Sequence, residues 1–195
     1  SLPFTKISNL EIPKHGNPWG YYYEDILINP MATRHYLYAH NINRYLKLIE
    51  KPTVCEIGAA FGGVAYFLRR LNPKISYLNF DLPEVQILNH YFLMSNYPSK
   101  KFLLYGEAGS EKITTEIIKE FDFILLPNFQ LKELEKDSID MVFNSGSLSE
   151  MSEDTVLEYI SRINSVSKRY FYTSNSTLPI YNYKGHEEVI LSNVV

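Results

Sequence analysis

The sequence contains a single cysteine, Cys55, which excludes an internal disulfide and any metal site built from several thiolates. No apolar run reaches the length needed to span a membrane, and the first residues show no signal-peptide pattern. The formal net charge is −3, and the 19 Lys and Arg residues are scattered rather than gathered in a basic stripe. These absences argue against a membrane-spanning or nucleic-acid-binding protein and favour a reducing, cytoplasmic location.

The length and composition of the chain predict one globular domain with a sizeable core. The 195 residues are 45% apolar and 21% charged, values typical of soluble globular proteins. Tyrosine is unusually frequent, with 16 copies that include a run of three at 21–23. Because tyrosine joins an apolar ring to a polar tip, it suits both the edge of a core and a pocket for a polyhydroxylated ligand. Tyr23 is therefore a candidate substrate contact, with an ordinary core or rim position as the alternative.

The N-terminal quarter of the chain predicts one helix after an irregular segment. Prolines are frequent in residues 1–28, which predicts irregular structure there. Asn29 and Pro30 then form a helix start, and Lys51-Pro52 marks the end of that helix. An apolar stripe on one helix face is expected from Tyr38, Ile42, Tyr45 and Ile49. We expect residues 1–52 to pack on the cleft of a main α/β domain formed by residues 53–195.

Strand and helix patterns alternate through that main domain. Strands are predicted at 53–57, 75–81, 101–105, 121–126, 139–144, 169–173 and 189–195, and helices at 62–71, 83–96, 112–120 and 152–166. This alternation predicts a doubly wound, mostly parallel sheet with helices on both faces, a Rossmann-like α/β fold. Ligands of such folds bind where the strands end, so the residues that follow each strand are the candidate site.

A small-residue turn follows the first predicted strand in the stretch VCEIGAAFGGVAYFL at 54–68. It fits the phosphate-binding pattern G-x-G-x-x-G only loosely, and Glu56 stands just ahead of its first glycine. A carboxylate there disfavours a phosphate and favours an ammonium group. S-adenosylmethionine has an amino acid end and no phosphate, so it fits this turn better than a dinucleotide does. The candidate cofactor residues in the turn are Glu56, Gly58, Ala59, Ala60, Phe61 and Gly62.

Polar residues after two other strands extend the predicted cofactor site. Asp81 ends the second predicted strand, where an acid hydrogen-bonds ribose hydroxyls in these folds, and Leu82 follows it. Asn144 and Ser145 end a later strand and are candidates for the methionine end of the cofactor. The alternative is a tight turn and an aspartate that merely precedes a helix.

Several stretches resemble the class I S-adenosylmethionine-dependent methyltransferases, and more narrowly the bacterial sugar O-methyltransferases. They are GNPWGY at 16–21, the turn stretch at 54–68, YLNFDLPEVQILNHYFL at 77–93 and MVFNSGSLSEM at 141–151, with weaker support from RYFYTSN at 169–175. The resemblance implies the Rossmann-like methyltransferase fold and a sugar or glycan hydroxyl as the acceptor. The chain departs from the family at Ala59 and Ala60, which replace usual loop glycines. It also has one candidate strand after residue 175, where the superfamily fold ends in a hairpin.

Methyl transfer to a hydroxyl needs in-line alignment and a base that takes the proton. Glu150 and His186 are the candidate bases, and Ser147 is a candidate acceptor contact beside Tyr23. The alternative for Ser147 and Glu150 is a cluster that starts a helix. No histidine pair has zinc spacing, so no metal site is predicted. Two other functions stay open: a non-catalytic binding module with the same fold and, less favoured by Glu56 and Ala60, a nicotinamide-dependent dehydrogenase.

Overall fold

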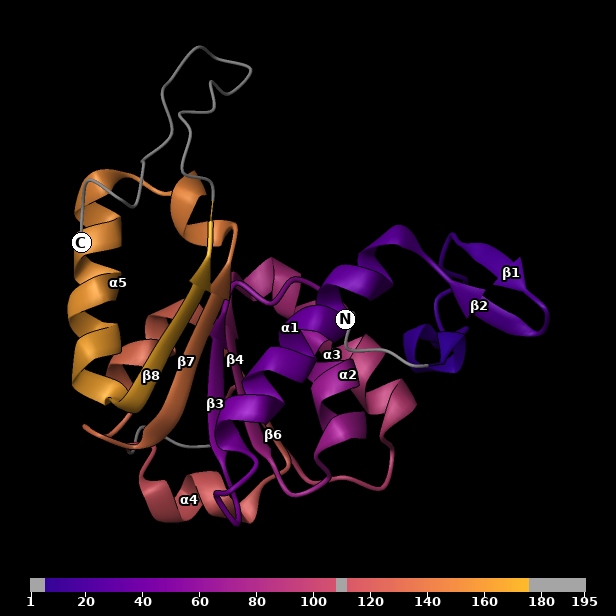
Figure 1. Ribbon diagram of the computed structural model, residues 1–195. Coiled ribbons are helices and arrows are strands. Elements are labelled where there is room, and N and C mark those ends of the chain that lie inside the picture. Colours follow the sequence, from indigo (N-terminus) through magenta and orange to yellow (C-terminus); the bar gives the residue numbers. More distant parts are fainter. Residues whose placement is uncertain (1–5, 108–111, 176–195) are drawn as a thin grey trace.

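The computed structural model describes residues 6–107 and 112–175, which form a central parallel sheet between two layers of helices (Figure 1). The strand order in the sheet is β5-β6-β4-β3-β7-β8, and every neighbouring pair is parallel. The strands are β3 (Thr53–Ile57), β4 (Ser76–Asp81), β5 (Phe102–Leu104), β6 (Phe123–Pro127), β7 (Ile139–Ser145) and β8 (Ser167–Ser174). The prediction of a doubly wound α/β fold with a mostly parallel sheet is confirmed.

Helices cover both faces of this sheet. One face carries the first three helices and the other carries the last two (Figure 1). The helices are α1 (Pro30–Leu46), α2 (Gly63–Leu71), α3 (Pro83–Asn96), α4 (Thr115–Glu120) and α5 (Glu153–Val166), with short 3-10 turns η1 (Ile7–Leu10), η2 (Asn128–Glu133) and η3 (Ser147–Glu150). Within residues 6–107 and 112–175, none of these helices combines the length and apolarity needed to cross a bilayer.

Helix α1 begins where the sequence predicts, but a different face of it is buried. The Asn29 side chain accepts a hydrogen bond from the Ala32 N–H, which caps the first turn. The helix ends at Leu46, earlier than the predicted Lys51-Pro52. Its buried residues are Ala32, Tyr36, Ala39, Ile42 and Leu46. Ile42 thus lies on the buried face as predicted, whereas Tyr45 is exposed, so the predicted stripe is wrong in part.

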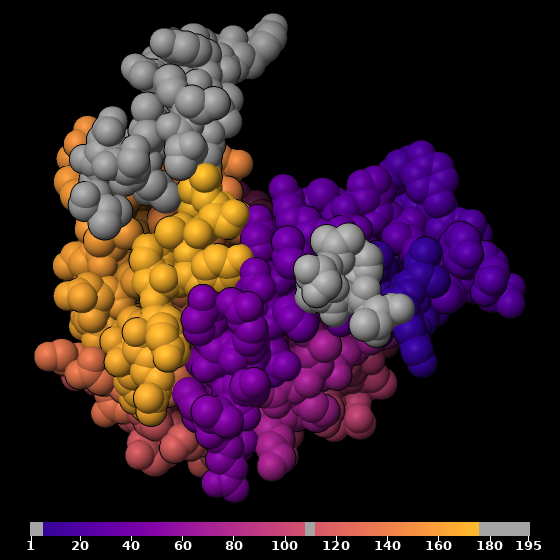
Figure 2. Space-filling model, in the orientation of Figure 1, coloured from indigo at the N-terminus to yellow at the C-terminus, as the bar shows by residue number. Residues whose placement is uncertain are grey.

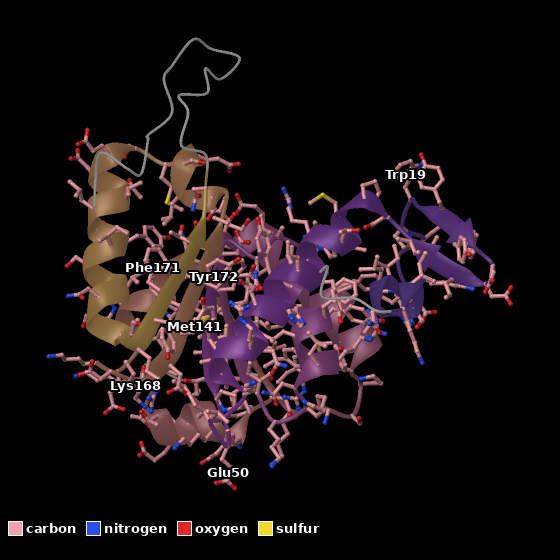
Figure 3. The ribbon with its side chains drawn as sticks, viewed as in Figure 1. Trp19, Glu50, Met141, Lys168, Phe171 and Tyr172 are labelled. Carbon is pink, nitrogen blue, oxygen red and sulfur yellow. The ribbon has the colours of Figure 1, made fainter. Side chains whose placement is uncertain are left out.

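The aromatic residues of the predicted stripe pack against strand β8 at the sheet edge. Tyr38 and Tyr45 place their rings 6.1 Å and 5.6 Å from those of Tyr172 and Tyr170. Figure 2 shows α1 and β8 side by side on one surface, and Figure 3 shows Tyr172 and Met141 near this junction. The small residues Ala32 and Ala39 of α1 are instead fully buried in the main core. Which face of α1 is buried depends on the neighbouring elements and not on helical periodicity.

The N-terminal segment contains a β-hairpin that the sequence did not predict. Strand β1 (Tyr21–Tyr23) pairs with β2 (Ile26–Ile28) in antiparallel register. The connecting turn places Glu24 at φ +51, and it lacks the glycine or asparagine that normally marks such a turn. The three tyrosines of β1 are exposed, while Leu27 of β2 is buried against the core.

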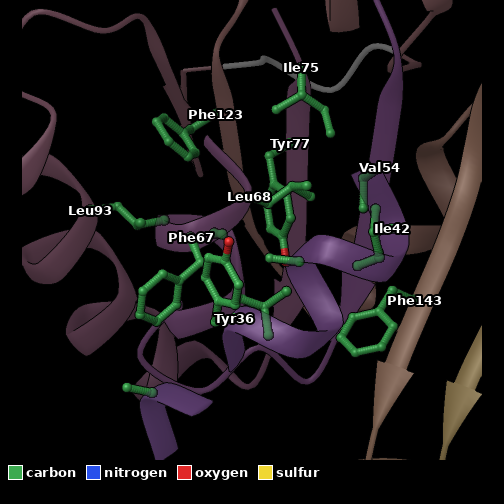
Figure 4. Close-up of a cluster of buried hydrophobic side chains, with 14 of the residues drawn as sticks. Tyr36, Ile42, Val54, Phe67, Leu68, Ile75, Tyr77, Leu93, Phe123 and Phe143 are labelled. Carbon is green, nitrogen blue, oxygen red and sulfur yellow. The ribbon is translucent and has the colours of Figure 1, made fainter. Parts of the chain in front are cut away.

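The main core lies between the sheet and helices α1 to α3 (Figure 4). Phe67 and Leu68 of α2 meet Tyr77 of β4, Phe123 of β6 and Phe143 of β7 in that cluster (Figure 4). A second core lies on the opposite face, beneath α4 and α5, and contains Cys55. Strand β3 is buried along its whole length because both cores enclose it. The predicted strand 189–195 and His186 lie outside the described residues.

Candidate functional site

The candidate site lies at the carboxyl ends of β3, β4 and β7. These three strands are adjacent, because β3 pairs with β4 on one side and with β7 on the other. The small-residue turn leaves β3 at Gly58 and enters α2 at Gly63, while Asp81 and Ser145 end the other two strands. The topology therefore brings the predicted turn, Asp81, Asn144 and Ser145 to one edge of the sheet.

The turn itself requires its glycines. Gly58 and Gly62 have φ of +75 and +94, in the left-handed region that glycine enters without strain. A Cβ at Gly58 would lie 2.6 Å from Ser147 Cβ and closer still to its Oγ. Ala60 also has a positive φ, of +50, and bears the strain that a side chain adds there. Alanine at this position is tolerated because Asp81 and Asn89 hold its backbone.

Asp81 connects the end of β4 to the turn. Its Oδ2 accepts a hydrogen bond of 2.8 Å from the Ala60 N–H, and its Oδ1 accepts one of 2.8 Å from the Leu82 N–H. Burial raises the pKa of Asp81 above its ordinary value, and these backbone N–H groups act in the opposite direction. A carboxylate has about four acceptor positions, so Asp81 retains acceptor capacity for hydroxyl donors of a ligand.

Glu56 lies deeper in the sheet, just ahead of the turn. Only 3% of its surface is exposed, and the Tyr77 hydroxyl donates a hydrogen bond to its Oε2. Burial raises the pKa of Glu56 to about 8, the Tyr77 hydrogen bond lowers it in part, and the charge of Asp81 raises it further. At neutral pH the carboxyl group is therefore mostly protonated unless a cation lies beside it.

We expect the buried proton of Glu56 to make stability depend on pH. The unfolded chain releases this proton near 4.5 and the folded protein near 8, so the folded state binds more protons between these values. The free energy of unfolding should fall as pH rises through this interval, by up to about 1.4 kcal/mol per pH unit. Glu56→Gln keeps an acceptor for Tyr77 and should remove the fall, as measured by urea unfolding at several pH values. The Glu50→Gln change is the control, and an unchanged slope in Glu56→Gln would contradict this origin.

A polar network joins the ends of β3, β7 and β8. The Asn144 Nδ2 group donates to the Ile57 carbonyl at 2.9 Å and to Ser147 Oγ at 2.6 Å. The Ser147 hydroxyl in turn donates to the same carbonyl at 3.2 Å. Asn175 donates to Asn144 Oδ1 at 2.7 Å, just beyond β8. Asn144 is fully buried, so its amide holds strands together, whereas Ser145 remains partly exposed.

The structure does not bring all the predicted residues together. Glu150 ends the 3-10 turn η3 and is exposed. Tyr23 lies in the hairpin, which Figure 1 shows on the opposite side of the molecule from β8 and α5. His186 lies outside the described residues. Ser152, just after Glu150, caps α5 by accepting a hydrogen bond from the Thr155 N–H.

Three residues that position the site were not singled out in the sequence. Asn89 of α3 donates a hydrogen bond of 3.2 Å to the Ala60 carbonyl, which fixes the middle of the turn. Tyr77 holds Glu56, and Asn175 holds Asn144. The helix pattern gave no signal for Asn89, because the buried face of α3 also carries Gln86 while its apolar residues Ile87 and Leu88 are exposed. The other two depend on contacts between strands, which no local pattern reveals.

Comparisons with known proteins agree with this architecture. No protein-family model and no curated protein matches the chain. A solved structure from Methanococcus maripaludis, assigned as an S-adenosyl-L-methionine-dependent methyltransferase, superposes with a TM-score of 0.51 at 14% identity, over 71% of this chain and 55% of that one. This chain has the Rossmann-like fold of that methyltransferase.

Two further solved structures superpose less closely. One is a SAM-dependent methyltransferase from Aquifex aeolicus, with a TM-score of 0.47 at 16% identity over 67% of this chain and 58% of that one. The other is the mitomycin 7-O-methyltransferase MmcR, with a TM-score of 0.45 at 13% identity over 77% of this chain and 42% of that one. The chain thus spans less than two thirds of the length of each of these proteins.

Proposed function

We propose that the chain is an S-adenosylmethionine-dependent methyltransferase that acts on a hydroxyl oxygen. The observation that carries the proposal is the pair of carboxyl groups, Glu56 and Asp81, at a glycine turn where dinucleotide-binding proteins hold phosphate. Residues 54–68 contain no Lys, Arg or His that would attract a phosphate. A ligand with hydroxyl groups and an ammonium group, but without phosphate, matches this site.

The residues present fit such a cofactor. The remaining acceptor capacity of Asp81 would receive the ribose hydroxyls, and Glu56 would pair with the ammonium group. Ser145 and Asn144 would lie at the methionine end, where the N-terminus of α2 favours a carboxylate. Small residues from Gly58 to Gly62, with Phe61 and Leu82, would enclose the adenosine. When bound, the cofactor supplies a methyl group on a positively charged sulfur.

The proposed acceptor is a hydroxyl of a sugar or glycan. Glu150 is the proposed base that takes the hydroxyl proton, because it is an exposed carboxylate on the turn that follows β7. His186 is a second proposed base, and Ser147 and Tyr23 are proposed acceptor contacts. A sugar hydroxyl has no proton that leaves easily, so a carboxylate or imidazole aligned with it would accelerate transfer.

One observation favours a non-catalytic binding module as the second candidate. The Ser147 hydroxyl and the Asn144 amide bind each other and the Ile57 carbonyl, so both are used within the protein. These internal hydrogen bonds compete with the proposed roles of Ser147 as an acceptor contact and of Asn144 as a cofactor contact. A nicotinamide-dependent dehydrogenase is less well supported, because Glu56 would face the pyrophosphate of its cofactor.

Calorimetric titration with S-adenosylmethionine, S-adenosylhomocysteine and NAD tests the proposal. We expect micromolar binding of both sulfur compounds and none of NAD, followed by transfer of a labelled methyl group to a sugar hydroxyl. Glu150→Gln should retain S-adenosylhomocysteine affinity while losing most of that transfer, because the amide cannot accept the proton. Binding without transfer to any glycan would favour the binding module. No binding at millimolar concentration would overturn both.

A further inference from the structure

A cavity of about 600 Å³ lies between the N-terminal segment and helices α1, α2 and α3. It is separate from the strand ends that hold Asp81 and Asn144. Aromatic and imidazole rings from four parts of the chain line it, among them Trp19, His35, Phe61, Tyr66, Tyr91 and Phe92. Figure 3 shows Trp19 beside the hairpin, far from Phe171 on β8. We call this space the aromatic cavity.

The walls of the aromatic cavity are preorganised by contacts between rings. Phe61 lies edge-to-face with Phe92, with centroids 5.1 Å apart, and with His35 at 5.5 Å. Tyr66 meets Phe92 at 5.8 Å. Gly63 makes this arrangement possible, because a Cβ there would lie 2.5 Å from His35 Cε1 and closer still to its Nδ1. Such edge-to-face chains are favourable and leave flat ring surfaces available to a planar guest.

The mouth of the cavity exposes large apolar side chains. Trp19, Leu88 and Tyr91 are exposed by 66%, 60% and 57%. They come from two parts of the chain and surround one concave space, unlike apolar residues scattered singly on a surface. A volume of about 600 Å³ is within the range of small-molecule sites. Exposure and shape together favour a small apolar ligand.

The absence of charged side chains among the described residues that line the cavity favours a neutral ligand. None of the described residues that line the cavity is Asp, Glu, Lys or Arg, so an ionic ligand finds no carboxylate, ammonium or guanidinium partner there. The His35 ring makes no side-chain hydrogen bond with any residue that the structure describes. Burial lowers the pKa of His35 to about 4, with Arg34 contributing, so the ring is neutral at pH 7. A neutral imidazole offers one donor and one acceptor to a ligand hydroxyl.

We propose that the aromatic cavity binds a neutral, planar aromatic molecule whose hydroxyl group hydrogen-bonds to His35. The rings would enclose the planar part of the ligand, and Trp19 and Leu88 would close over it. The glycine turn contacts both sites, because Ala60 bonds to Asp81 while Phe61 lines the cavity. The proposal goes beyond methyl transfer and does not rest on it.

Titration with 2-naphthol tests the proposal on the full chain, with matched variants on α3. Trp19 is the single tryptophan, so its indole N–H signal in a nitrogen–proton correlation spectrum reports binding directly. Leu88 lines the cavity, whereas its neighbour Ile87, exposed by 68%, does not. Leu88→Asp should weaken naphthol binding by about tenfold or more, because it places a charge against apolar rings. Ile87→Asp should leave the affinity unchanged.

Other results would overturn the proposal. It fails if 2-naphthol does not shift the Trp19 signal, or if the two variants bind it equally. Self-association of the chain that Leu88→Asp abolishes, without naphthol binding, would make this surface an interface between copies. If Leu88→Asp does not fold, Tyr91→Ala replaces it, with the same expected loss. S-adenosylhomocysteine binding is measured on the same samples, so failure of the cofactor site is distinguished from failure of this one.

Discussion

Asp81→Asn should weaken binding of S-adenosylhomocysteine by about 100-fold or more. The carboxylate is proposed to accept two ribose hydroxyls, and a hydrogen bond to a charged group contributes about 1.5–3 kcal/mol. Asparagine offers one oxygen, and its NH₂ group would face the N–H of either Ala60 or Leu82, where the carboxylate now accepts. The variant therefore loses acceptors for the ligand and for the turn together. Calorimetric titration of both proteins measures the loss.

Glu84→Gln is the matched control for Asp81→Asn. Glu84 is an exposed acid in the first turn of α3, close to Asp81 in sequence, and it supplies none of the hydrogen bonds that hold the described turn. Its replacement should leave the affinity within about twofold. Adenosine alone should show the same large loss in Asp81→Asn, because the ribose is part of adenosine. An Asp81→Asn protein that binds adenosine as well as the unaltered chain does would remove Asp81 from the proposed site.

Gly58→Ala should destabilise the fold by about 3 kcal/mol. Its φ of +75 adds strain of about 1–2 kcal/mol for a residue with a Cβ. The new Cβ also overlaps Ser147 Oγ and Cβ, and overpacking of this kind costs about 1–3 kcal/mol. The strain belongs to Gly58 alone, whereas the overlap needs both residues. Urea unfolding of the single variant gives the sum of the two effects.

A double-mutant cycle separates these effects. Ser147→Gly removes both overlapping atoms, so Gly58→Ala in that background should cost only the strain, about 1–2 kcal/mol. Gly106 is the control position, because it has φ +91 and nothing within 4 Å of an added Cβ. Gly106→Ala should cost about as much as Gly58→Ala does in the Ser147→Gly background. Equal costs of Gly58→Ala with and without the Ser147 side chain would show that Ser147 does not restrict the turn.

Local sequence patterns determined the fold class and the position of the turn. Strand and helix patterns, with periods of two and 3.6 residues, can be recognised from the local sequence. Their alternation along the chain then predicts a parallel sheet. Gly58 and Gly62 were predictable as turn residues, and Asn29 as a helix cap, for the same reason. The position of Asp81 follows from the fold class, since parallel strands end at the same edge.

Other features depend on which surfaces meet, and only the tertiary structure shows them. The buried face of α1 was predicted in part wrongly, because half-buried Tyr38 and exposed Tyr45 find partners on β8, more than a hundred residues later. The pairing of Tyr77 with Glu56 depends on the parallel register of β3 and β4. The network around Asn144 needs β7 and the end of β8 together. No local periodicity in the sequence predicts such contacts.

The aromatic cavity is a further feature that local sequence patterns do not predict. Trp19, His35, Phe61 and Tyr91 come from four separate segments, and each looks like an ordinary core or surface residue in its own segment. Helix packing over the sheet brings their rings into one wall, and Gly63 provides the space for His35. Periodicity and turn residues therefore specify the sheet and its ligand edge. Packing between distant segments decides which side chains surround a cavity, because that depends on register and helix contacts that are established only on folding.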